Sequence, residues 1–455
     1  MKSTSEIDPK PYQWSPQPEA AKFVQAKIDA AVSASPWLAA FKGRLLNETG
    51  TRLVDWLDHV AVGNSDGFES AGFLPTENEN VFLNQAGIFP KLTVAKHLNA
   101  GESRVGVKVE RIESFLAEHE SDITKHNVFG KDYDQVRIAQ IDFKDGGQIC
   151  IVERHGVQSM IPGQHEEASD TSQREKVLQS FRSRDRSDTD SEGAFRQTAD
   201  RFMKAASKVG KNYACDLFFQ AEREYWQSKN KAAQIQFGRQ EALGLGWANH
   251  DHHTYRCNRV WFRPLVLTFE LMGFECRERF YAGPEAGWGA QVLEHSGCGI
   301  VIFADVDLTE NEITGDFAHD GLEIGKEFGT VGLWCQLHGD SFLAAGMHHL
   351  ECQFDFEAAR TQLATMGIET MAPFTDFPFL RQAFTKGESW KVDRERLDKL
   401  VADGVISEED VQRFDAEGVR GSHLEILERN DGYKGFNQTG VSKIILQTNP
   451  TLADE

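Results

Sequence analysis

Three residues have the types and the setting that bind a catalytic metal ion: His252, His349 and Glu425. Each lies in a short segment whose apolar pattern predicts a β-strand. These segments span residues 251–257, 347–353 and 422–427. Two imidazoles and one carboxylate on separate strands can form a facial triad that leaves half of an octahedral coordination sphere open. We therefore expect one divalent metal of the non-haem Fe(II) type, to which a substrate and O2 can bind.

A fourth residue, Arg256, belongs to the same predicted strand as His252. Side chains at alternate positions of a strand share one face, so His252 and Arg256 are expected to point into the same space. A permanently charged, planar guanidinium beside an open metal position suits the carboxylate of an organic acid. Each of these residues alone is better explained as a core histidine or a surface ion-pair partner, but the four together favour a site.

Two further histidines stand directly beside the expected ligands. By simple alternation His253 and His348 project to the opposite face of the sheet, which makes them packing or supporting residues. A shift of one residue in the strand register would exchange their roles with those of His252 and His349. The register therefore decides which histidines bind the metal.

A glycine-bounded segment at 435–440 follows the predicted strand of Glu425. It carries the amide side chains of Asn437 and Gln438, which would suit a loop that closes on a small polar substrate. We predict that both amides bind substrate, although a simple turn explains the same residues equally well.

The charge of the chain excludes one class of partner. The 455 residues include 70 acidic and 49 basic ones, which gives a formal net charge of −21. Lysines and arginines are interspersed with acids and form no basic run, so a phosphate backbone would be repelled. We expect a small-molecule partner and no nucleic acid, and a homo-oligomer is compatible with the composition.

Cysteine usage and hydropathy indicate the compartment. The seven cysteines are odd in number and include no CxxC pair, so they suggest neither a disulfide framework nor a structural zinc knuckle. No stretch approaches about 18 uninterrupted apolar residues, and the N-terminal residues show no apolar leader. We expect a cytoplasmic protein that does not contact a membrane.

The length of the chain predicts more than one hydrophobic core. Residues 157–198 contain little that could be buried, so they are expected to form a polar linker or mobile excursion between 1–156 and 199–455. On each side of it an Ala-rich, helical preface leads to a strand that contains the dipeptide Asp-His, at 58–59 and at 251–252.

The pattern of apolar residues predicts the fold class. After residue 250 it indicates a strand, a helix and three more strands, and a second run of this kind begins at Met347. We expect an α+β fold of tandem βαβββ modules with helical prefaces and insertions. The N-terminal half gives a rougher version of the same order.

The N-terminal half lacks part of the expected ligand set. His59 and Glu153 take the places of the first and last ligands, but the intervening strand at 104–109 contains no histidine. Gly63 stands where Arg256 stands in the second half. One imidazole and one carboxylate make a weak metal site, so we expect a degenerate, metal-free partner domain.

Over residues 240–450 the chain resembles the 2-oxoadipate dioxygenase/decarboxylases of the vicinal oxygen chelate superfamily. Asp251-His252 with Arg256 matches the family's Asp-His-x-x-x-Arg element. His348-His349 stands where the family has Asn-His, and His423-Leu-Glu425 stands where it has an aromatic-acidic strand. The chain departs from the family in the histidine at 348, in its additional N-terminal half and in its long insertions.

The resemblance implies a reaction. It is the Fe(II)-dependent oxidative decarboxylation of a 2-oxo acid such as 2-oxoadipate by O2, giving a hydroxy acid and CO2, with Arg256 as the catalytic residue that binds a substrate carboxylate. Two alternatives stay open. One is a glyoxalase-like lyase, isomerase or hydrolase that uses Zn(II), Ni(II) or Mn(II). The other is a non-catalytic protein that binds a small acid, for which a broken ligand set would be the sequence mark.

Overall fold

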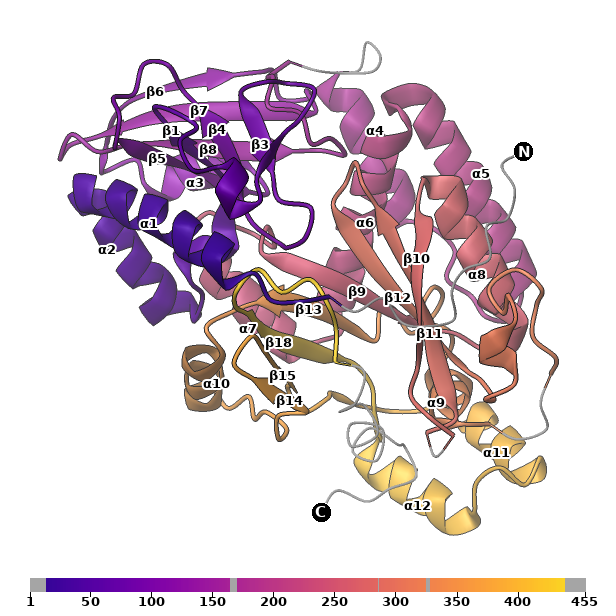
Figure 1. The fold of residues 1–455 in the computed structure, drawn as a ribbon. Helices are drawn as coiled ribbons and strands as arrows, with labels where there is room; N and C mark the ends of the chain where they lie inside the picture. The colour runs from indigo at the N-terminus through magenta and orange to yellow at the C-terminus, as the bar shows by residue number, and fades with distance from the viewer. Residues whose placement is uncertain (1–13, 164–169, 285, 325–327, 438–455) are drawn as a thin grey trace.

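The computed structural model describes residues 14–163, 170–284, 286–324 and 328–437. Within them the strands form two eight-stranded mixed sheets, the first from the N-terminal half and the second from the C-terminal half (Figure 1). Helices cover the sheets, and the middle helices lie beside the second sheet (Figure 1).

The first sheet follows a preface of two helices, α1 (Pro18–Ala34) and α2 (Pro36–Arg44). Its strands are β1 (Leu57–Val62), β2 (Leu74–Pro75), β3 (Val81–Leu83), β4 (Lys91–Val94), β5 (Ser103–Val109), β6 (Ile123–Phe129), β7 (Val136–Phe143) and β8 (Gln148–Arg154). They are arranged in the order β2-β3-β4-β1-β5-β8-β7-β6, and α3 (Ile112–Glu118) connects β5 to β6.

The second sheet repeats this plan. Its strands are β9 (His250–Arg256), β10 (Glu275–Tyr281), β11 (Trp288–His295), β12 (Ile300–Asp307), β13 (His349–Gln353), β14 (Thr375–Phe377), β15 (Leu380–Phe384) and β18 (His423–Arg429). Their order is β10-β11-β12-β9-β13-β18-β15-β14. The helices α8 (Arg259–Met272) and α10 (Phe356–Thr365) follow β9 and β13 along the chain.

Two insertions interrupt the second half. The helix α9 (Thr330–His338) lies between β12 and β13. Between β15 and β18 the chain forms a small two-stranded sheet and two helices, which are β16 (Ser389–Trp390), β17 (Val419–Arg420), α11 (Arg394–Ala402) and α12 (Glu408–Glu417).

Each sheet consists of two modules joined through their first strands. In the second sheet β9 runs parallel to β12 and β13 runs parallel to β18, whereas β9 and β13 are antiparallel. The first sheet has the same relations among β1, β4, β5 and β8. In the module of β1 a short 3-10 turn at Glu69–Ala71 takes the place of the α-helix. The expected α+β fold of tandem βαβββ modules, the vicinal oxygen chelate arrangement, is confirmed.

In the order of the chain, four helices follow the last strand of the first sheet and precede the first strand of the second. They are α4 (Thr171–Arg182), α5 (Ser191–Val209), α6 (Lys211–Ser228) and α7 (Lys231–Glu241). The helix α4 falls inside 157–198, where the sequence suggested a polar linker or mobile excursion. Its few apolar residues, Val177, Leu178 and Phe181, lie on one side of the helix and are buried, with the Phe181 ring 5.4 Å from that of Phe218 in α6. A narrow apolar stripe was therefore enough to pack this segment. The division of the chain into 1–156, 157–198 and 199–455 stays a prediction.

Alternation along β9 separates the core from the candidate site. Tyr255 and His253 are buried toward the core, where the His253 ring lies 5.2 Å from Phe219 of α6. The intervening residues His252, Thr254 and Arg256 consequently point to the other face of the sheet, where they line a cavity. Packing of the core face thus fixes which residues face that cavity.

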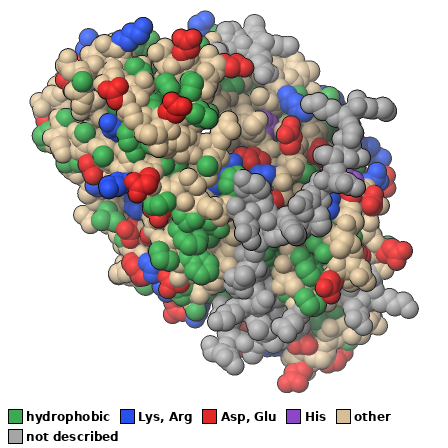
Figure 2. Space-filling view, in the orientation of Figure 1, with side chains coloured by type: hydrophobic (Ala, Val, Ile, Leu, Met, Phe, Trp, Pro, Cys, Tyr) green, Lys and Arg blue, Asp and Glu red, His purple; other side chains and the backbone are tan. Residues whose placement is uncertain are grey.

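On the face shown in Figure 2, acidic and basic side chains are interspersed and do not gather by sign. Among the described residues, no helix combines the length and the apolar character needed to cross a bilayer.

Candidate metal centre

The structure brings His252, His349 and Glu425 together from three adjacent strands. In the strand pairing, Glu351 of β13 lies opposite both His252 of β9 and Glu425 of β18, and His349 lies opposite Thr254. One potential ligand atom from each of the three residues lies within 4.8 Å of the other two, and all three residues are buried. This is the spacing at which a single cation can be bound.

The side-chain atoms in this group contact one another directly. His349 Nε2 lies 3.0 Å from Glu425 Oε2, and His252 Nε2 lies 2.9 Å from Glu351 Oε2. Gln382 donates a hydrogen bond of 3.1 Å to the other oxygen of Glu425. Imidazole nitrogens and carboxylate oxygens that converge in this way fit a divalent transition metal.

Glu351 is the residue of this group to which sequence reasoning assigned no role. It is fully buried, and together with Asp251 and His252 it forms a second group with metal-binding geometry. Its position two residues after His349 in a strand was the available signal, because both side chains then share one face.

Neighbouring groups hold both imidazoles in orientation. His252 Nδ1 lies 3.3 Å from Asp251 Oδ1, and Arg429 binds the same carboxylate through two hydrogen bonds of 3.0 and 2.9 Å. His349 Nδ1 lies 2.9 Å from His348 Nδ1. In both histidines Nδ1 is engaged and Nε2 faces the carboxylates, as is usual for metal-binding histidines.

Burial and charge shift the protonation of these groups. Burial alone would lower the pKa of His252, but Glu351 and Asp251 outweigh it and raise that pKa to about 10. Burial and the neighbouring Glu425 raise the pKa of Glu351 to about 8. For His349, burial and the charge of His252 lower the pKa well below its usual value. The group therefore shares protons among closely spaced acids and bases.

A cavity of about 90 Å³ opens beside these residues, and Arg256 lies in its wall. The Arg256 guanidinium lies 5.6 Å from the ring centre of Trp334, and Asp305 stands opposite Arg256 in the strand pairing. Burial raises the pKa of Asp305 to about 7, against the opposing charge of Arg256. The rest of the wall is mainly aromatic, with Phe280, Trp288, Phe303, Phe374, Phe384 and Phe436.

Of the two amides expected near the substrate, Asn437 lines this cavity. Its side-chain nitrogen donates to Thr375 Oγ1 at 2.8 Å and to the Phe374 carbonyl at 3.2 Å, which fixes its position in the wall. Gln438 lies outside the described residues.

The first sheet has a different set of residues at the equivalent positions. His59 contacts Asp58 through Nδ1 at 2.8 Å, and its ring packs so closely on Gly106 that any side chain there would collide with it. Cys150 lies opposite Gly106, as Glu425 lies opposite Glu351. The last-ligand position therefore belongs to Cys150, and the sequence-based placement of Glu153 there was wrong.

Glu153 instead has a structural role. It accepts hydrogen bonds from the Ile112 amide at 2.9 Å and from Arg137 at 3.0 Å, and it contacts His155 at 2.9 Å. These partners outweigh the effect of burial and lower the pKa of Glu153 to about 2. Glu153 lies three residues beyond Cys150 in β8, so its side chain points to the opposite face of the strand.

One further cluster was missed from the sequence. All seven cysteines are free, and the absence of a CxxC pair suggested no cysteine-based metal site. In the structure Cys215 of α6 meets His295 and Cys298, which flank the β11–β12 turn, within metal-binding distance. Cys215 lies 80 residues before His295, so the spacing of the sequence did not connect it to the other two.

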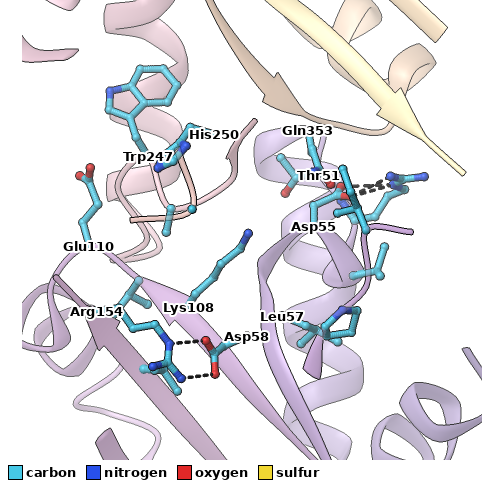
Figure 3. Close-up of a pocket in the computed structure, with 18 of the residues that line it drawn as sticks. Thr51, Asp55, Leu57, Asp58, Lys108, Glu110, Arg154, Trp247, His250 and Gln353 are labelled. Carbon is cyan, nitrogen blue, oxygen red and sulfur yellow. Dashed lines mark hydrogen bonds and ion pairs between the residues drawn. The ribbon is translucent and has the colours of Figure 1, made fainter. Parts of the chain in front are cut away.

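A second and much larger cavity, of about 1380 Å³, lies between the two halves (Figure 3). Its wall includes the Asp58–Arg154 ion pair of the first sheet and Arg429 and Gln353 of the second. The two cavities share no lining residue.

No protein-family model matches the sequence, and neither does any curated protein. Solved structures match at low similarity. One described as a glyoxalase superfamily protein from Ralstonia eutropha JMP134 is 9% identical over 48% of this chain and 84% of its own, with a TM-score of 0.34. A 4-hydroxymandelate synthase variant from Streptomyces coelicolor is 11% identical over 88% and 97%, with a TM-score of 0.27. Methylmalonyl-CoA epimerase from Mycobacterium tuberculosis is 12% identical over 40% and 89%, with a TM-score of 0.23. With TM-scores this low, these matches assign no activity to this chain.

Proposed function

We propose that the second half of the chain is an Fe(II)-dependent dioxygenase that oxidatively decarboxylates a small 2-oxo acid. The observation that carries this proposal is the convergence of His252, His349 and Glu425 beside Arg256 in an aromatic-walled cavity. When bound by three protein ligands, Fe(II) supplies open coordination positions and redox chemistry with O2. In the overall reaction a 2-oxo acid and O2 give CO2 and a 2-hydroxy acid one carbon shorter, so both atoms of O2 enter the products.

Arg256 binds the substrate in this proposal. Its permanent charge cannot bind a metal, and its side chain shares the cavity with His252. A guanidinium fork binds a carboxylate through two hydrogen bonds, which fixes the orientation of the acid as well as its position. Asn437 lines the same cavity and adds a polar contact at its rim.

The aromatic wall excludes water and limits the size of the substrate. A volume of about 90 Å³ corresponds to roughly three water molecules in the liquid. Such a space accommodates the reacting end of a short acid.

Neighbouring residues hold the side chains of the three proposed ligands in orientation. Asp251, positioned by Arg429, orients His252, and His348 orients His349. Gln382 holds one oxygen of Glu425 and leaves the other toward His349. Orientation of this kind lowers the cost of assembling the site around a cation.

Glu351 favours a second candidate function. With its carboxylate 2.9 Å from His252 Nε2, it adds another oxygen ligand and reduces the number of open positions. A centre with two imidazoles and two carboxylates suits Zn(II), Ni(II) or Mn(II) in a glyoxalase-like lyase, isomerase or hydrolase, which consumes no O2.

Oxygen consumption separates the two candidates. Metal-free protein is loaded anaerobically with Fe(II) or Zn(II) and mixed with 2-oxo acids of increasing chain length in an oxygen electrode, with CO2 release measured in parallel. We expect O2 uptake and equal CO2 release with Fe(II) alone. Turnover with Zn(II) and no O2 uptake would establish the glyoxalase-like function instead, and tight acid binding without turnover would indicate a binding protein.

A further inference from the structure

The large cavity between the two halves contains positively charged and hydrogen-bonding groups that the proposed reaction does not use. Lys108 of β5 and His250 at the start of β9 lie in its wall (Figure 3), and Arg223 of α6 also lines it. These residues come from the first sheet, the middle helices and the second sheet. The three therefore meet only in the folded chain.

The side-chain amine of Lys108 forms no hydrogen bond and no ion pair within the described residues, although Lys108 lines the cavity (Figure 3). In the second sheet the equivalent position is Gln353, which donates to Asp251 at 2.9 Å. The carboxylate that Lys108 could use in the same way, Asp58, is bound by Arg154 through hydrogen bonds of 2.6 and 3.0 Å. The ammonium group is thus left to face the cavity.

Arg223 is in a comparable situation. Its side chain is only 6% exposed, and its one contact with an acid is a long one, 3.5 Å from Nη2 to Glu110 Oε1. Within the described residues its Nε and Nη1 have no hydrogen-bond partner, and neither has Nδ1 of His250. A buried guanidinium donor without a partner costs about 1–3 kcal/mol, so an anion that draws the Arg223 side chain toward the cavity would recover part of that cost.

We propose that Lys108, Arg223 and His250 form a binding site for the carboxylate or phosphate group of a small organic anion, separate from the metal centre. All three residues line the same cavity, and Lys108 and His250 lie in the part of it that Figure 3 shows. A guanidinium and an ammonium together suit a planar or tetrahedral oxyanion. Because Glu110 also borders Arg223, hydrogen bonding rather than charge alone decides affinity, and the site discriminates against chloride.

Calorimetric titration of the metal-free, full-length chain tests this proposal. The probes are inorganic phosphate and succinate, with sodium chloride at matched ionic strength as the reference. We expect saturable binding of one anion per chain, and binding at least tenfold weaker in Lys108→Met and in Arg223→Gln. Lys42→Met is the matched control, because Lys42 lines the same cavity near its exposed edge, 4.0 Å from Asp29.

Two results would overturn the proposal. One is binding no stronger than that of chloride for both probes. The other is binding that survives in Lys108→Met and is lost in Arg256→Met, which would place the anion in the small cavity of the proposed enzyme. This second result leaves the proposed function intact, so the two ideas fail separately.

A measurement on the unaltered chain avoids dependence on folding of the variants. Lysines are reductively methylated with and without phosphate, and the extent at Lys108 and Lys42 is measured by peptide mass spectrometry. We expect phosphate to slow methylation of Lys108 severalfold and to leave Lys42 unchanged. Equal rates at Lys108 with and without phosphate would show that the amine does not contact the anion.

Discussion

The two sheets share a supporting scaffold and differ at the positions where chemistry would occur. In the first, Asp58 contacts His59 at 2.8 Å and is clamped by Arg154. In the second, Asp251 contacts His252 at 3.3 Å and is clamped by Arg429. The strand pairing puts these residues at equivalent places, so the Asp-His-Arg arrangement belongs to the fold and is not by itself a mark of a metal site.

A second pair of equivalent residues supports the same conclusion. Glu153 accepts the Ile112 amide at the start of α3, and Glu428 accepts the Phe356 amide at the start of α10. Both carboxylates satisfy an otherwise free helix N-terminus. These glutamates connect the last strand of a module to its helix, and they are conserved between the halves for that structural reason.

The two halves differ at three positions on the face of the sheet that carries the candidate metal centre in the second half. Where the second sheet has His349, Glu351 and Glu425, the strand pairing puts Arg104, Gly106 and Cys150 at the equivalent places of the first. A guanidinium repels a cation, and glycine offers no ligand atom. If the proposed centre binds a metal, the residues that distinguish it from the first half are therefore those of β13 and β18, whereas the Asp-His pair of β9 is common to both halves.

The largest effect is expected from removing a ligand in the second half only. His349→Ala should abolish tight Fe(II) binding and all O2 uptake, a greater loss than the ~10–100-fold that removal of a supporting residue costs. Arg104→Ala, the change at the equivalent position of the first half, should leave about one metal per chain. Metal analysis by mass spectrometry and circular dichroism check occupancy and folding.

This comparison can fail in two ways. Full occupancy in His349→Ala would remove that residue from the ligand set. Two metals per chain in the parent, reduced to one in His59→Ala, would show that the first half is a working site rather than a degenerate one.

Arg256 has no counterpart in the first half, where Gly63 stands four residues after His59. Arg256→Met keeps much of the side-chain volume but removes a buried charge that pairs with the substrate, a loss of about 2–5 kcal/mol. We expect kcat/KM to fall accordingly with unchanged iron content. Arg256→Lys should recover part of the loss, and an unaltered substrate affinity in Arg256→Met would argue against the assigned role.

Because both halves contain the Asp-His-Arg arrangement, the same Asp→Asn substitution can be made in each. We expect it to change Fe(II) affinity in the second half only. Asp251→Asn should weaken Fe(II) binding about 10–100-fold, because it frees the imidazole of His252 from its orienting partner. Asp58→Asn should leave Fe(II) affinity unchanged and only lower stability, since Arg154 loses its buried partner. Titration of both variants with Fe(II) under argon measures the difference; equal affinities would make Asp251 a purely structural residue as well.

The sequence predicted the βαβββ modules and the meeting of His252, His349 and Glu425, because strand periodicity alone assigns faces. It did not predict that Glu351 would join them or that Glu153 would cap a helix. Those roles depend on strand register, which is set by pairing between segments about 44 residues apart in the first sheet and about 75 to 100 residues apart in the second. The sequence could not predict the large cavity either, because Lys108, Arg223 and His250 come to line it only when the two halves pack together.

The smallest expected effect concerns protons in the first half. Hydrogen bonds with Asp58 and Cys150 outweigh burial and raise the pKa of His59 to about 9, above its ordinary value of 6.5. The folded chain therefore keeps a proton that the unfolded chain loses, so this stabilisation is complete below pH 6.5 and is lost as pH rises through about 9. In metal-loaded protein the Nε2 atom of His252 binds the metal and cannot hold a proton. Of the two histidines in the Asp-His pairs, only His59 then contributes to this change of stability with pH.

We accordingly expect the free energy of unfolding of metal-loaded protein to fall by roughly 3 kcal/mol across this pH window because of His59. In His59→Gln that part of the decline should disappear, whereas His97→Gln, a change at an exposed histidine of the same half, should keep it. Urea unfolding at several pH values, with metal in excess, measures the difference. If His59→Gln and the parent decline equally, the first half does not retain a proton where the second half binds a metal, and the contrast between the two Asp-His pairs would have to be abandoned.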